Sequence, residues 1–215
     1  MRRLSFEERR SELLDAAVRV IGRDGLAAAT TRAIVAEADM PLGAFHYVFA
    51  SRDDLLVAVI DHVTEQERLA AWIDAGADEN TDPADADAPT PGVAEILTRG
   101  LDGYLRLLVS APERELALLD VAAHAMRHDP AAVERQWQTY RIAARASLEY
   151  AADLARITWT LPLDDLAWSL ASCLDGLTLS WLTARDADAA RTHIRFLAAA
   201  FAAHAIPRKE TPDAD

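Results

Sequence analysis

The chain has 215 residues, of which 51% are hydrophobic and 27% charged, enough for one large globular domain or two small ones. Its single cysteine, Cys173, excludes an internal disulfide and a cysteine-based zinc cluster and fits a reducing compartment. No apolar stretch reaches the roughly 18 residues of a membrane-spanning helix, and the first residues lack the apolar core of a signal peptide. We therefore expect a cytoplasmic protein without a membrane partner.

The net charge of −13 is unevenly distributed along the chain. Residues 1–60 hold eight arginines and nine acidic residues, whereas residues 61–215 hold fourteen basic and twenty-six acidic residues. The acidity therefore belongs to the second region, and the first keeps arginines that can meet phosphates at short range, where local charge outweighs the total. These arginines are Arg2, Arg3, Arg9, Arg10, Arg32 and Arg52.

The first two predicted helices cover residues 6–24 and 30–38, with Gly25 as the stop after the first. Thr30 can cap the second helix, because its hydroxyl can accept a free backbone amide of the opening turn. Apolar residues at helical spacing follow it. Pro41 ends this helix, because the residue before a proline is disfavoured in the α region.

A third helix of two turns is predicted over residues 42–48, directly after a proline that suits a first helical turn because it lacks an N–H. Phe45 and Phe49 are expected to point inward. The side chains expected on the outer face are Leu42, Ala44, His46 and Tyr47. Two short helices joined by a tight turn are the layout of a helix-turn-helix whose second helix enters the major groove of DNA.

The run Gly-Ala-Phe-His-Tyr-Val-Phe at 43–49, followed by Ser-Arg-Asp-Asp-Leu-Leu at 51–56, resembles the recognition-helix signature of the TetR family of transcriptional regulators. Residues 13–21 and Gly25 resemble the first helix of that family and its glycine stop. The detailed resemblance covers the region of residues 10–60. Beyond it, the resemblance is architectural and implies an all-helical ligand-binding and dimerising region.

The sequence departs from the family pattern at three positions. Asp39 replaces the usual turn glycine, and aspartate enters the left-handed region more easily than most residues. His46 stands where a tyrosine is usual, and Ala33 where an acidic capping partner is usual.

The helix-turn-helix and the resemblance together define a predicted DNA-binding surface. Gly43 and Ala44 permit a close approach of the backbone, while His46 and Tyr47 can hydrogen-bond to phosphates or base edges. Arg52 is expected to hold a phosphate. The full predicted set is Thr31, Arg32, Leu42, Gly43, Ala44, His46, Tyr47 and Arg52. The alternative is an ordinary helical hairpin with exposed polar residues.

Periodic apolar residues predict six further helices, at 52–75, 93–110, 112–128, 130–159, 163–184 and 186–205. Residues 76–92 are acidic and rich in proline and glycine, and are expected to form a solvated connecting loop. The predicted fold class is all-α, with about nine helices. We expect a three-helix DNA-binding domain at 1–51, a larger helical effector-binding and dimerisation domain at 52–206, and a flexible tail at 207–215.

The second region holds aromatic residues with polar atoms and a few charged residues on helices that should enclose a core. Aromatic walls with a few polar groups describe many small-molecule pockets, although core packing is the common fate of aromatic residues. The predicted ligand-binding residues are Tyr104, His124, Trp137, Tyr140, Arg141, Asp175 and Trp181. Arg141 and Asp175 are the most informative if buried, because an unpaired buried charge is costly.

Asp120, His124 and His128 recur at four-residue steps, a spacing that can bind a metal. They lie opposite the apolar side of their helix, on the expected solvent face, and no other residue completes a ligand set. We therefore predict no metal and no cofactor.

The last two predicted helices are expected to pair with their symmetry mates in a homodimer. The predicted interface residues are Leu166, Leu170, Leu174, Leu177, Ile194, Leu197 and Phe201. The alternative is burial of these residues inside the subunit. The run Leu-Asp-Gly-Leu at 174–177, followed by Trp181 and Leu182, resembles the dimerising end of the TetR family and favours the interface.

These features predict a ligand-responsive, DNA-binding transcriptional regulator rather than an enzyme. The expected form is a dimeric repressor of a palindromic double-stranded DNA operator, released by a small, mainly apolar effector. The alternatives are a helical enzyme or a protein-binding adaptor with an incidental helical hairpin. The sequence has no metal motif, nucleophile elbow or glycine-rich phosphate loop, which argues against an enzyme.

Overall fold

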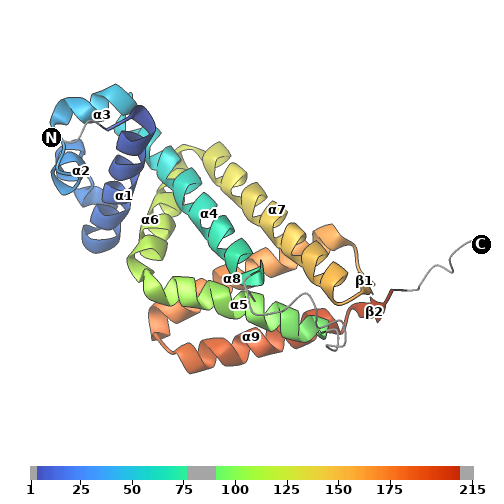
Figure 1. The fold of residues 1–215 in the computed structure, drawn as a ribbon. Coiled ribbons are helices and arrows are strands. Elements are labelled where there is room, and N and C mark those ends of the chain that lie inside the picture. The colour runs from blue at the N-terminus through green and yellow to red at the C-terminus, as the bar shows by residue number, and fades with distance from the viewer. Residues whose placement is uncertain (1–3, 77–90, 209–215) are drawn as a thin grey trace, which may run out of the picture. The chain divides into compact units, whose positions relative to one another are not determined.

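The computed structural model describes residues 4–76 and 91–208 (Figure 1). Within these ranges the chain forms nine α-helices, one short 3-10 helix and two three-residue strands, so the predicted all-α class is confirmed. None of the helices in these ranges is long and apolar enough to span a membrane. The elements are α1 (Phe6–Asp24), η1 (Leu26–Ala28), α2 (Thr31–Glu37), α3 (Leu42–Val48), α4 (Arg52–Gly76), α5 (Val93–Ser110), α6 (Pro112–His128), α7 (Pro130–Leu154), β1 (Ile157–Trp159), α8 (Leu163–Ala184), α9 (Ala187–Ala202) and β2 (Ala205–Pro207).

The chain divides into two compact units, which are described separately. Unit 1 comprises Met1–Glu67 and Leu108–Gln138, and unit 2 comprises Arg68–Leu107 and Thr139–Asp215. Helices α4, α5 and α7 each contribute residues to both units. The predicted domain boundary after residue 51 stays a prediction. Residues 77–90 of the expected connecting loop, and residues 209–215 of the expected tail, lie outside the described residues.

Helix α1 begins at a capping box and ends at a glycine. The N–H of Glu8 donates to Ser5 Oγ at 3.2 Å, and the N–H of Ser5 donates to Glu8 Oε2 at 2.8 Å, which satisfies two amides at the helix start. Gly25 follows the helix with a φ of 82°, a conformation that costs little only for glycine. The buried face of α1 consists of Leu13, Leu14, Ala16, Ala17, Val20 and Ile21.

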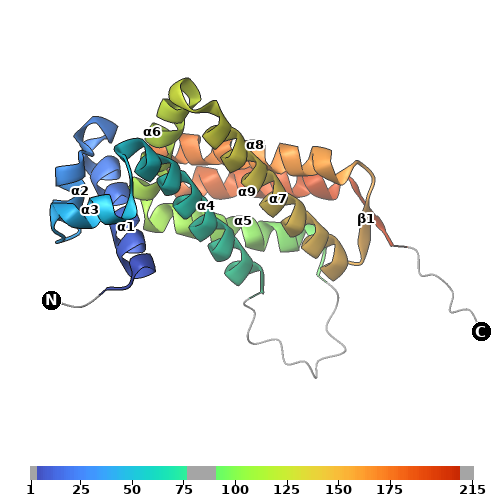
Figure 2. The same ribbon diagram turned by 90° about the horizontal axis from the view of Figure 1, so that it is seen from above.

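Within unit 1, α1 lies against α6 (Figure 2). At Gly22 the helices approach so closely that a Cβ atom would lie 2.2 Å from the carbonyl oxygen of Glu113. The N–H of Leu26, at the start of η1, donates to Asp120 Oδ2 on α6 at 3.2 Å. These contacts attach the segment between α1 and α2 to α6.

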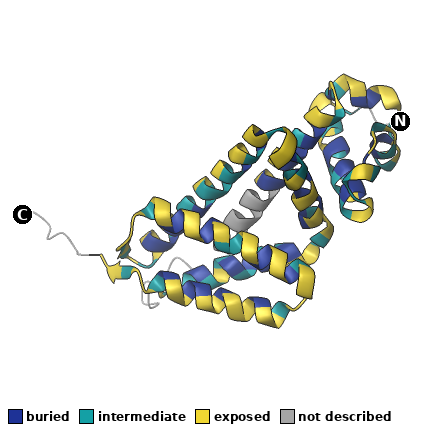
Figure 3. Ribbon diagram, turned by 180° about the vertical axis from the view of Figure 1, so that it is seen from behind, coloured by how far each residue is buried: buried dark blue, intermediate teal, exposed yellow. Residues whose placement is uncertain are grey.

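Within unit 2, α8 and α9 lie side by side (Figures 1 and 2). Arg185 ends α8 in the left-handed conformation, with a φ of 54°, and Asp186 starts α9 by accepting the N–H groups of Asp188 and Ala189 at 3.0 and 2.9 Å. Each helix has one buried and one exposed side, coloured dark blue and yellow in Figure 3. The buried sides form much of the core of unit 2.

Two helices end earlier than the sequence predicts. Helix α7 stops at Leu154 instead of residue 159, and α9 stops at Ala202 instead of residue 205. After α7 the backbone leaves the helix at Arg156, which has a φ of 53°.

The residues beyond these helix ends pair as strands. Strand β1 runs antiparallel to β2, with Thr158 opposite Ile206. The β-branched and aromatic residues of β1 fit a strand better than a helix. The prediction missed this preference because it continued the helical apolar pattern of α7 as far as residue 159. Arg208 follows β2 and donates to Asp153 Oδ1 at 2.8 Å, so the first two residues of the expected tail belong to the folded unit.

Candidate nucleic-acid interface

The turn between α2 and α3 has the hydrogen bonds of a tight helical junction. The N–H of Ala33 donates to Thr30 Oγ1 at 3.2 Å, so Thr30 caps α2. Asp39 has a φ of 51°, in the left-handed region that aspartate tolerates. The N–H of Met40 then donates to the carbonyl of Val35 at 2.8 Å. The predicted cap and the predicted role of Asp39 are both confirmed.

Helix α3 has a buried side and an exposed side. Phe45 is fully buried, whereas Tyr47 is 63% exposed and Leu42 43% exposed. Gly43 and His46 are also exposed. The exposed side therefore carries four of the predicted DNA-contacting residues.

The prediction that Ala44 lies on the exposed side is wrong, because its side chain is only 8% exposed. Residues three or four apart share a helix face, and Ala44 lies four residues before the half-buried Val48. Ala44 therefore packs on the inner side of α3, next to Phe45 in the sequence.

Helix α2 contributes two predicted contact residues from its first turn. Arg32 is exposed and Thr31 is half-buried. Arg32 has no carboxylate partner among the described residues. By contrast, Arg19 and Arg23 both pair with Glu37, at 2.8 and 3.2 Å, and these hydrogen bonds hold the pKa of Glu37 below its usual value. Arg32 therefore keeps a charge that is available to a phosphate.

Arg52 does not have the geometry expected of a phosphate ligand. Its Nε donates to the carbonyl of Ala29 at 2.8 Å, and its Nη2 donates to the carbonyl of Leu26 at 2.6 Å. These bonds tie the first turn of α4 to the connection between α1 and α2. They indicate a structural role for Arg52 within unit 1, and its phosphate contact stays a prediction.

The seven predicted ligand-binding residues divide between the two units, and their role in ligand binding stays a prediction. His124 and Trp137 belong to unit 1. The other five belong to unit 2, where Asp175 is exposed on α8. Desolvation nevertheless raises the pKa of Asp175 to about 6. Tyr140 is half-buried on α7.

Two buried residues of unit 2 with polar groups, Thr178 and Trp181, lie on one face of α8. The hydroxyl of Tyr104 on α5 hydrogen-bonds to that of the buried Thr178. One turn further, Trp181 is 7% exposed and its Nε1 has no hydrogen-bond partner among the described residues. An indole N–H without an acceptor costs free energy when it is buried. Among the described residues of unit 2, Trp181 therefore supplies a buried N–H donor that lacks an acceptor.

Arg141 on α7 also has an unpartnered atom among the described residues, its Nε. The guanidinium carbon lies 5.6 Å from the centre of the Trp168 ring on α8, a cation–π geometry. Arg141 is half-buried, so its guanidinium group is still partly accessible to solvent.

The histidines of α6 are used within the helix. The rings of His124 and His128 stack with centroids 4.2 Å apart, and Nδ1 of His128 lies 2.8 Å from the carbonyl of His124. Asp120 accepts the N–H of Leu26 instead of joining them. Across the described residues, no three acidic, histidine or cysteine side chains form a metal-binding group.

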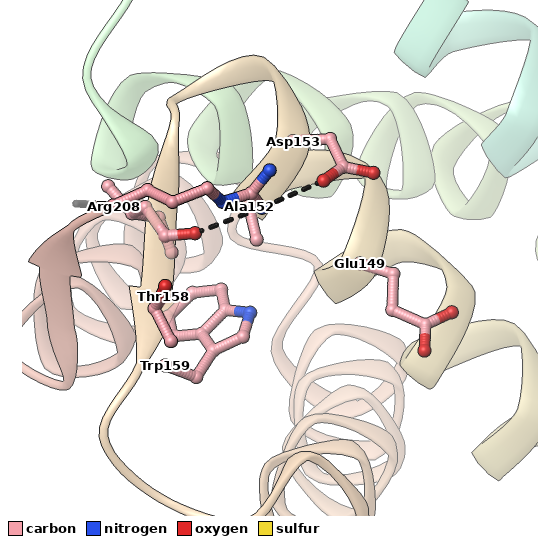
Figure 4. A pocket seen from close by; sticks show the side chains of 7 residues that line it. Glu149, Ala152, Asp153, Thr158, Trp159 and Arg208 are labelled. Carbon is pink, nitrogen blue, oxygen red and sulfur yellow. Dashed lines mark hydrogen bonds and ion pairs between the residues drawn. The ribbon is translucent and has the colours of Figure 1, made fainter. Parts of the chain in front are cut away.

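A surface hollow of about 400 Å³ lies beside the strand pair (Figure 4). Asp153 and Arg208 pair across it, and Glu149 pairs with Arg145 at 3.1 Å. The indole of Trp159 donates to the carbonyl of Leu148 at 3.1 Å. None of the predicted ligand-binding residues lines this hollow.

The predicted dimer residues are mostly core residues of the single chain. Six of the seven are at most 6% exposed: Leu166, Leu170, Leu177, Ile194, Leu197 and Phe201. The seventh, Leu174, is half-buried. Burial inside the subunit, the alternative that the sequence left open, therefore accounts for these residues, because the most regular leucine repeat is the one that fills the core. The dimer itself stays a prediction.

The opposite sides of α8 and α9 expose large apolar residues. Trp168 and Leu179 on α8 are 51% and 58% exposed, and Phe196 on α9 is 67% exposed. Trp168 and Leu179 are about three helical turns apart, so they share one side of α8. That side also carries Gly176, where an added Cβ would meet no atom within 4 Å. These exposed apolar residues could have been recognised in the sequence, but the more regular leucine repeat was chosen as the interface instead.

The fold and the exposed α3 define a helical protein with an N-terminal helix-turn-helix. Residues 13–59 match the sequence model described as bacterial regulatory proteins, tetR family. Two solved structures share the fold over most of the chain. A TetR-family regulator from Rhodococcus sp. has a TM-score of 0.73 at 20% identity, covering 91% of this chain and 98% of its own. The multidrug binding protein EbrR, solved with imidazole, has a TM-score of 0.60 at 27% identity, covering 95% and 93%.

Curated relatives agree with these matches. The nicotine-responsive transcriptional repressor HdnoR of Paenarthrobacter nicotinovorans is 32% identical over 126 residues, which is 59% of each chain, so the match spans little more than half of that relative. The transcriptional regulator BetI of Brucella suis biovar 1 is 27% identical over 186 residues, 86% of each chain. The resemblance to the TetR family of transcriptional regulators is confirmed: the family model covers residues 13–59, and the relatives named above are similar to this chain beyond that region. Its relatives are regulators and not enzymes, which agrees with the prediction from the sequence.

Proposed function

We propose that this regulator is a homodimeric repressor that binds a palindromic double-stranded DNA operator and leaves it when a small molecule binds to unit 2. The observation that carries the proposal is the exposed side of α3 in a TetR-family chain. The left-handed Asp39 and the buried Phe45 hold this helix, while Tyr47 is 63% exposed. A short helix of this kind fits the major groove of B-DNA.

The proposed DNA contacts come from α3 and the first turn of α2: Thr31, Arg32, Leu42, Gly43, His46 and Tyr47. Gly43 is exposed and an added Cβ there would meet no atom within 4 Å, so backbone can approach DNA at this point. His46 and Tyr47 supply hydrogen-bonding groups for base edges or phosphates. Arg32 supplies an unpaired positive charge for the phosphate backbone.

The proposed dimer uses the exposed apolar sides of α8 and α9. Trp168, Leu179 and Phe196 would be removed from water by a second copy of the chain, and such burial favours association. The open position at Gly176 would allow a partner helix to approach closely. A dimer presents two copies of α3, as a palindromic operator requires.

The proposed effector is a mainly apolar molecule that carries a hydrogen-bond acceptor. Trp181 supports this choice, because its buried N–H has no acceptor among the described residues. Thr178 and Tyr104 add two hydroxyl groups nearby on the same face of α8. The relative described as nicotine-responsive supports control by a small molecule. Release then requires that the effector bind the free conformation more tightly than the DNA-bound one.

DNA binding is tested by selecting duplexes from a random pool with the full chain and measuring their affinity by fluorescence anisotropy. We expect a palindromic sequence and an affinity that falls steeply with salt, because bound phosphates release counterions. Tyr47→Ala should weaken binding by about tenfold or more. Leu116→Ala, which truncates an exposed apolar residue on α6, is the matched control and should bind like the wild type. Recovery of no sequence-specific duplex would overturn the proposal.

A further inference from the structure

The first turn of α1 packs around Tyr47, an exposed side chain of α3. The ring of Phe6 meets the ring of Tyr47 edge to face, with centroids 5.7 Å apart and planes at 66°. The guanidinium carbon of Arg9 lies 5.2 Å from the centre of the same ring. Tyr47 is therefore contacted by both an aromatic residue and a cation from a helix far from it in the sequence.

Local structure in α1 fixes the positions of these two contacts. Phe6 is the first residue of the helix and Arg9 follows three positions later, so both side chains lie on one helix face. The capping box of Ser5 and Glu8 stabilises this first turn. Arg9 Nη2 also lies 3.4 Å from the carbonyl of Leu4, a long contact that leaves the guanidinium over the ring.

The exposure of these residues is unusual for a contact that serves only the core. Tyr47 is 63% exposed and Phe6 44% exposed, so the contact buries little apolar surface. The fold of unit 1 depends on fully buried residues such as Leu13 and Phe45 instead. The contact instead favours one orientation of the Tyr47 ring, because an exposed side chain without such neighbours can occupy several rotamers.

We propose that Phe6 and Arg9 are positioning residues for DNA recognition: they hold the Tyr47 ring in the orientation that it presents to the operator. This inference rests on the proposed DNA-binding function. A side chain that is ordered before binding loses less entropy when it contacts DNA, so preorganisation raises affinity without a direct contact from Phe6. The ring of Phe6 and the cation of Arg9 act on the same side chain and from the same helical turn.

A double-mutant cycle tests the inference, with the duplex that the wild-type chain selects from a random pool as the probe. Phe6→Ala should weaken binding by about two- to tenfold for each half-site, the range expected for immobilising one side chain. The same substitution in a Tyr47→Ala chain should have no further effect, because Phe6 acts through the ring. Additive losses would overturn the inference. Leu116→Ala is the control for truncating an exposed apolar residue.

Arg9 separates ring positioning from a phosphate contact. Arg9→Lys keeps the charge but loses the planar group that stacks on the ring. We expect weaker binding with an unchanged dependence on salt, and no further loss in the Tyr47→Ala chain. Wild-type affinity for Arg9→Lys, together with a shallower salt dependence for Arg9→Met, would instead assign Arg9 to a phosphate and overturn its positioning role.

The two proposals fail in different ways. If the wild-type chain selects no duplex, the proposed function fails. If it selects a duplex and Tyr47→Ala weakens binding, but Phe6→Ala and Arg9→Lys bind like the wild type, only the positioning role fails. Circular dichroism and thermal unfolding identify any variant that has lost its fold, and Phe6→Leu, which keeps an apolar side chain without a ring, serves as the second variant at that position.

Discussion

Arg52 and Arg32 are similar in the sequence, since both are arginines at the start of a helix in the N-terminal region, but their surroundings differ. Arg52 donates to two backbone carbonyls, those of Leu26 and Ala29. Arg32 is exposed and has no carboxylate partner among the described residues. The residue type shows that a positive charge is present, whereas the neighbouring carbonyls determine whether that charge is available to DNA.

Replacement of Arg52 should therefore reduce the stability of the protein. Arg52→Ala removes the donors to two carbonyls near the end of α1, and we expect a loss of about 1–3 kcal/mol in the free energy of unfolding. Urea unfolding followed by circular dichroism measures this loss. Arg32→Ala is the control and should keep wild-type stability while weakening DNA binding. Equal stability of both variants would contradict the structural role of Arg52.

Asp175 provides a pH-dependent prediction at the same scale. Desolvation raises the pKa of this carboxyl to about 6 from an ordinary value of about 3.9. The folded state therefore prefers the protonated form, and ionisation of Asp175 opposes folding as the pH rises through this range. Because the residue is exposed, solvent screening keeps the effect small.

Asp175→Asn should accordingly increase the stability of the protein at pH 8, and the gain should shrink as the pH falls to 5. Urea unfolding at the two pH values, compared with wild type, measures the difference. Asp61→Asn, at an exposed position on α4, is the control. A gain that grows as the pH falls would have the wrong sign for a raised pKa.

At the scale of elements, α8 and α9 each carry two apolar sides with different roles. One side is buried in unit 2, with Leu177 at 2% and Ile194 at 0% exposure. The other exposes Trp168, Leu179 and Phe196 to solvent. Helical periodicity identifies both stripes but does not say which one faces the core, because that depends on the neighbouring helices.

A charge on the exposed side should prevent dimerisation without unfolding the chain. Leu179→Glu places a carboxylate where the proposed dimer needs an apolar contact, and Gly176→Leu fills the space that a partner helix would use. Analytical ultracentrifugation should find monomers for both variants. Leu154→Glu, at an exposed apolar position near the end of α7, should remain a dimer. Intact dimers in both test variants would move the interface elsewhere.

For the whole molecule, the distribution of charge suits a regulator that binds DNA through one small region. Most of the net charge of −13 lies beyond residue 60, where it opposes non-specific contact with a polyanion. Residues 1–60 are nearly neutral, and Arg32 has no carboxylate partner in the part of the chain that the structure describes. Under the proposed function, specific binding would then depend on the geometry of α3 rather than on a general attraction to DNA.

Effector binding should be coupled to operator release across the whole chain. Apolar compounds that carry a hydrogen-bond acceptor should quench or shift tryptophan fluorescence and weaken operator binding by about 5–150-fold, equivalent to 1–3 kcal/mol of coupling. Trp181→Phe keeps the apolar volume but removes the N–H donor, so it should reduce effector affinity while operator binding in the absence of effector stays unchanged. Trp159→Phe, whose indole is already paired with Leu148, is the matched control. Compounds that bind without changing operator affinity would contradict the induction mechanism.

The sequence by itself determined the helical class, the starts of the helices and the helix-turn-helix, because these depend on local signals. Thr30 caps α2, Asp39 enters the left-handed region and Gly25 follows α1, each for reasons that belong to a few neighbouring residues. The signature in α3 was sufficient to indicate the resemblance to the TetR family, whose model matches residues 13–59. The buried Phe45 also followed from spacing within a single helix.

Only the tertiary structure decided which side of each helix meets which neighbour. Arg52 is bound to carbonyls of another segment, Ala44 packs inward, and Leu170 fills the core of unit 2 rather than a dimer face. The pairing of β1 with β2 also joins residues far apart in the chain. A helix repeat gives the same apolar pattern for a core and for an interface, so only the positions of the surrounding elements distinguish the two.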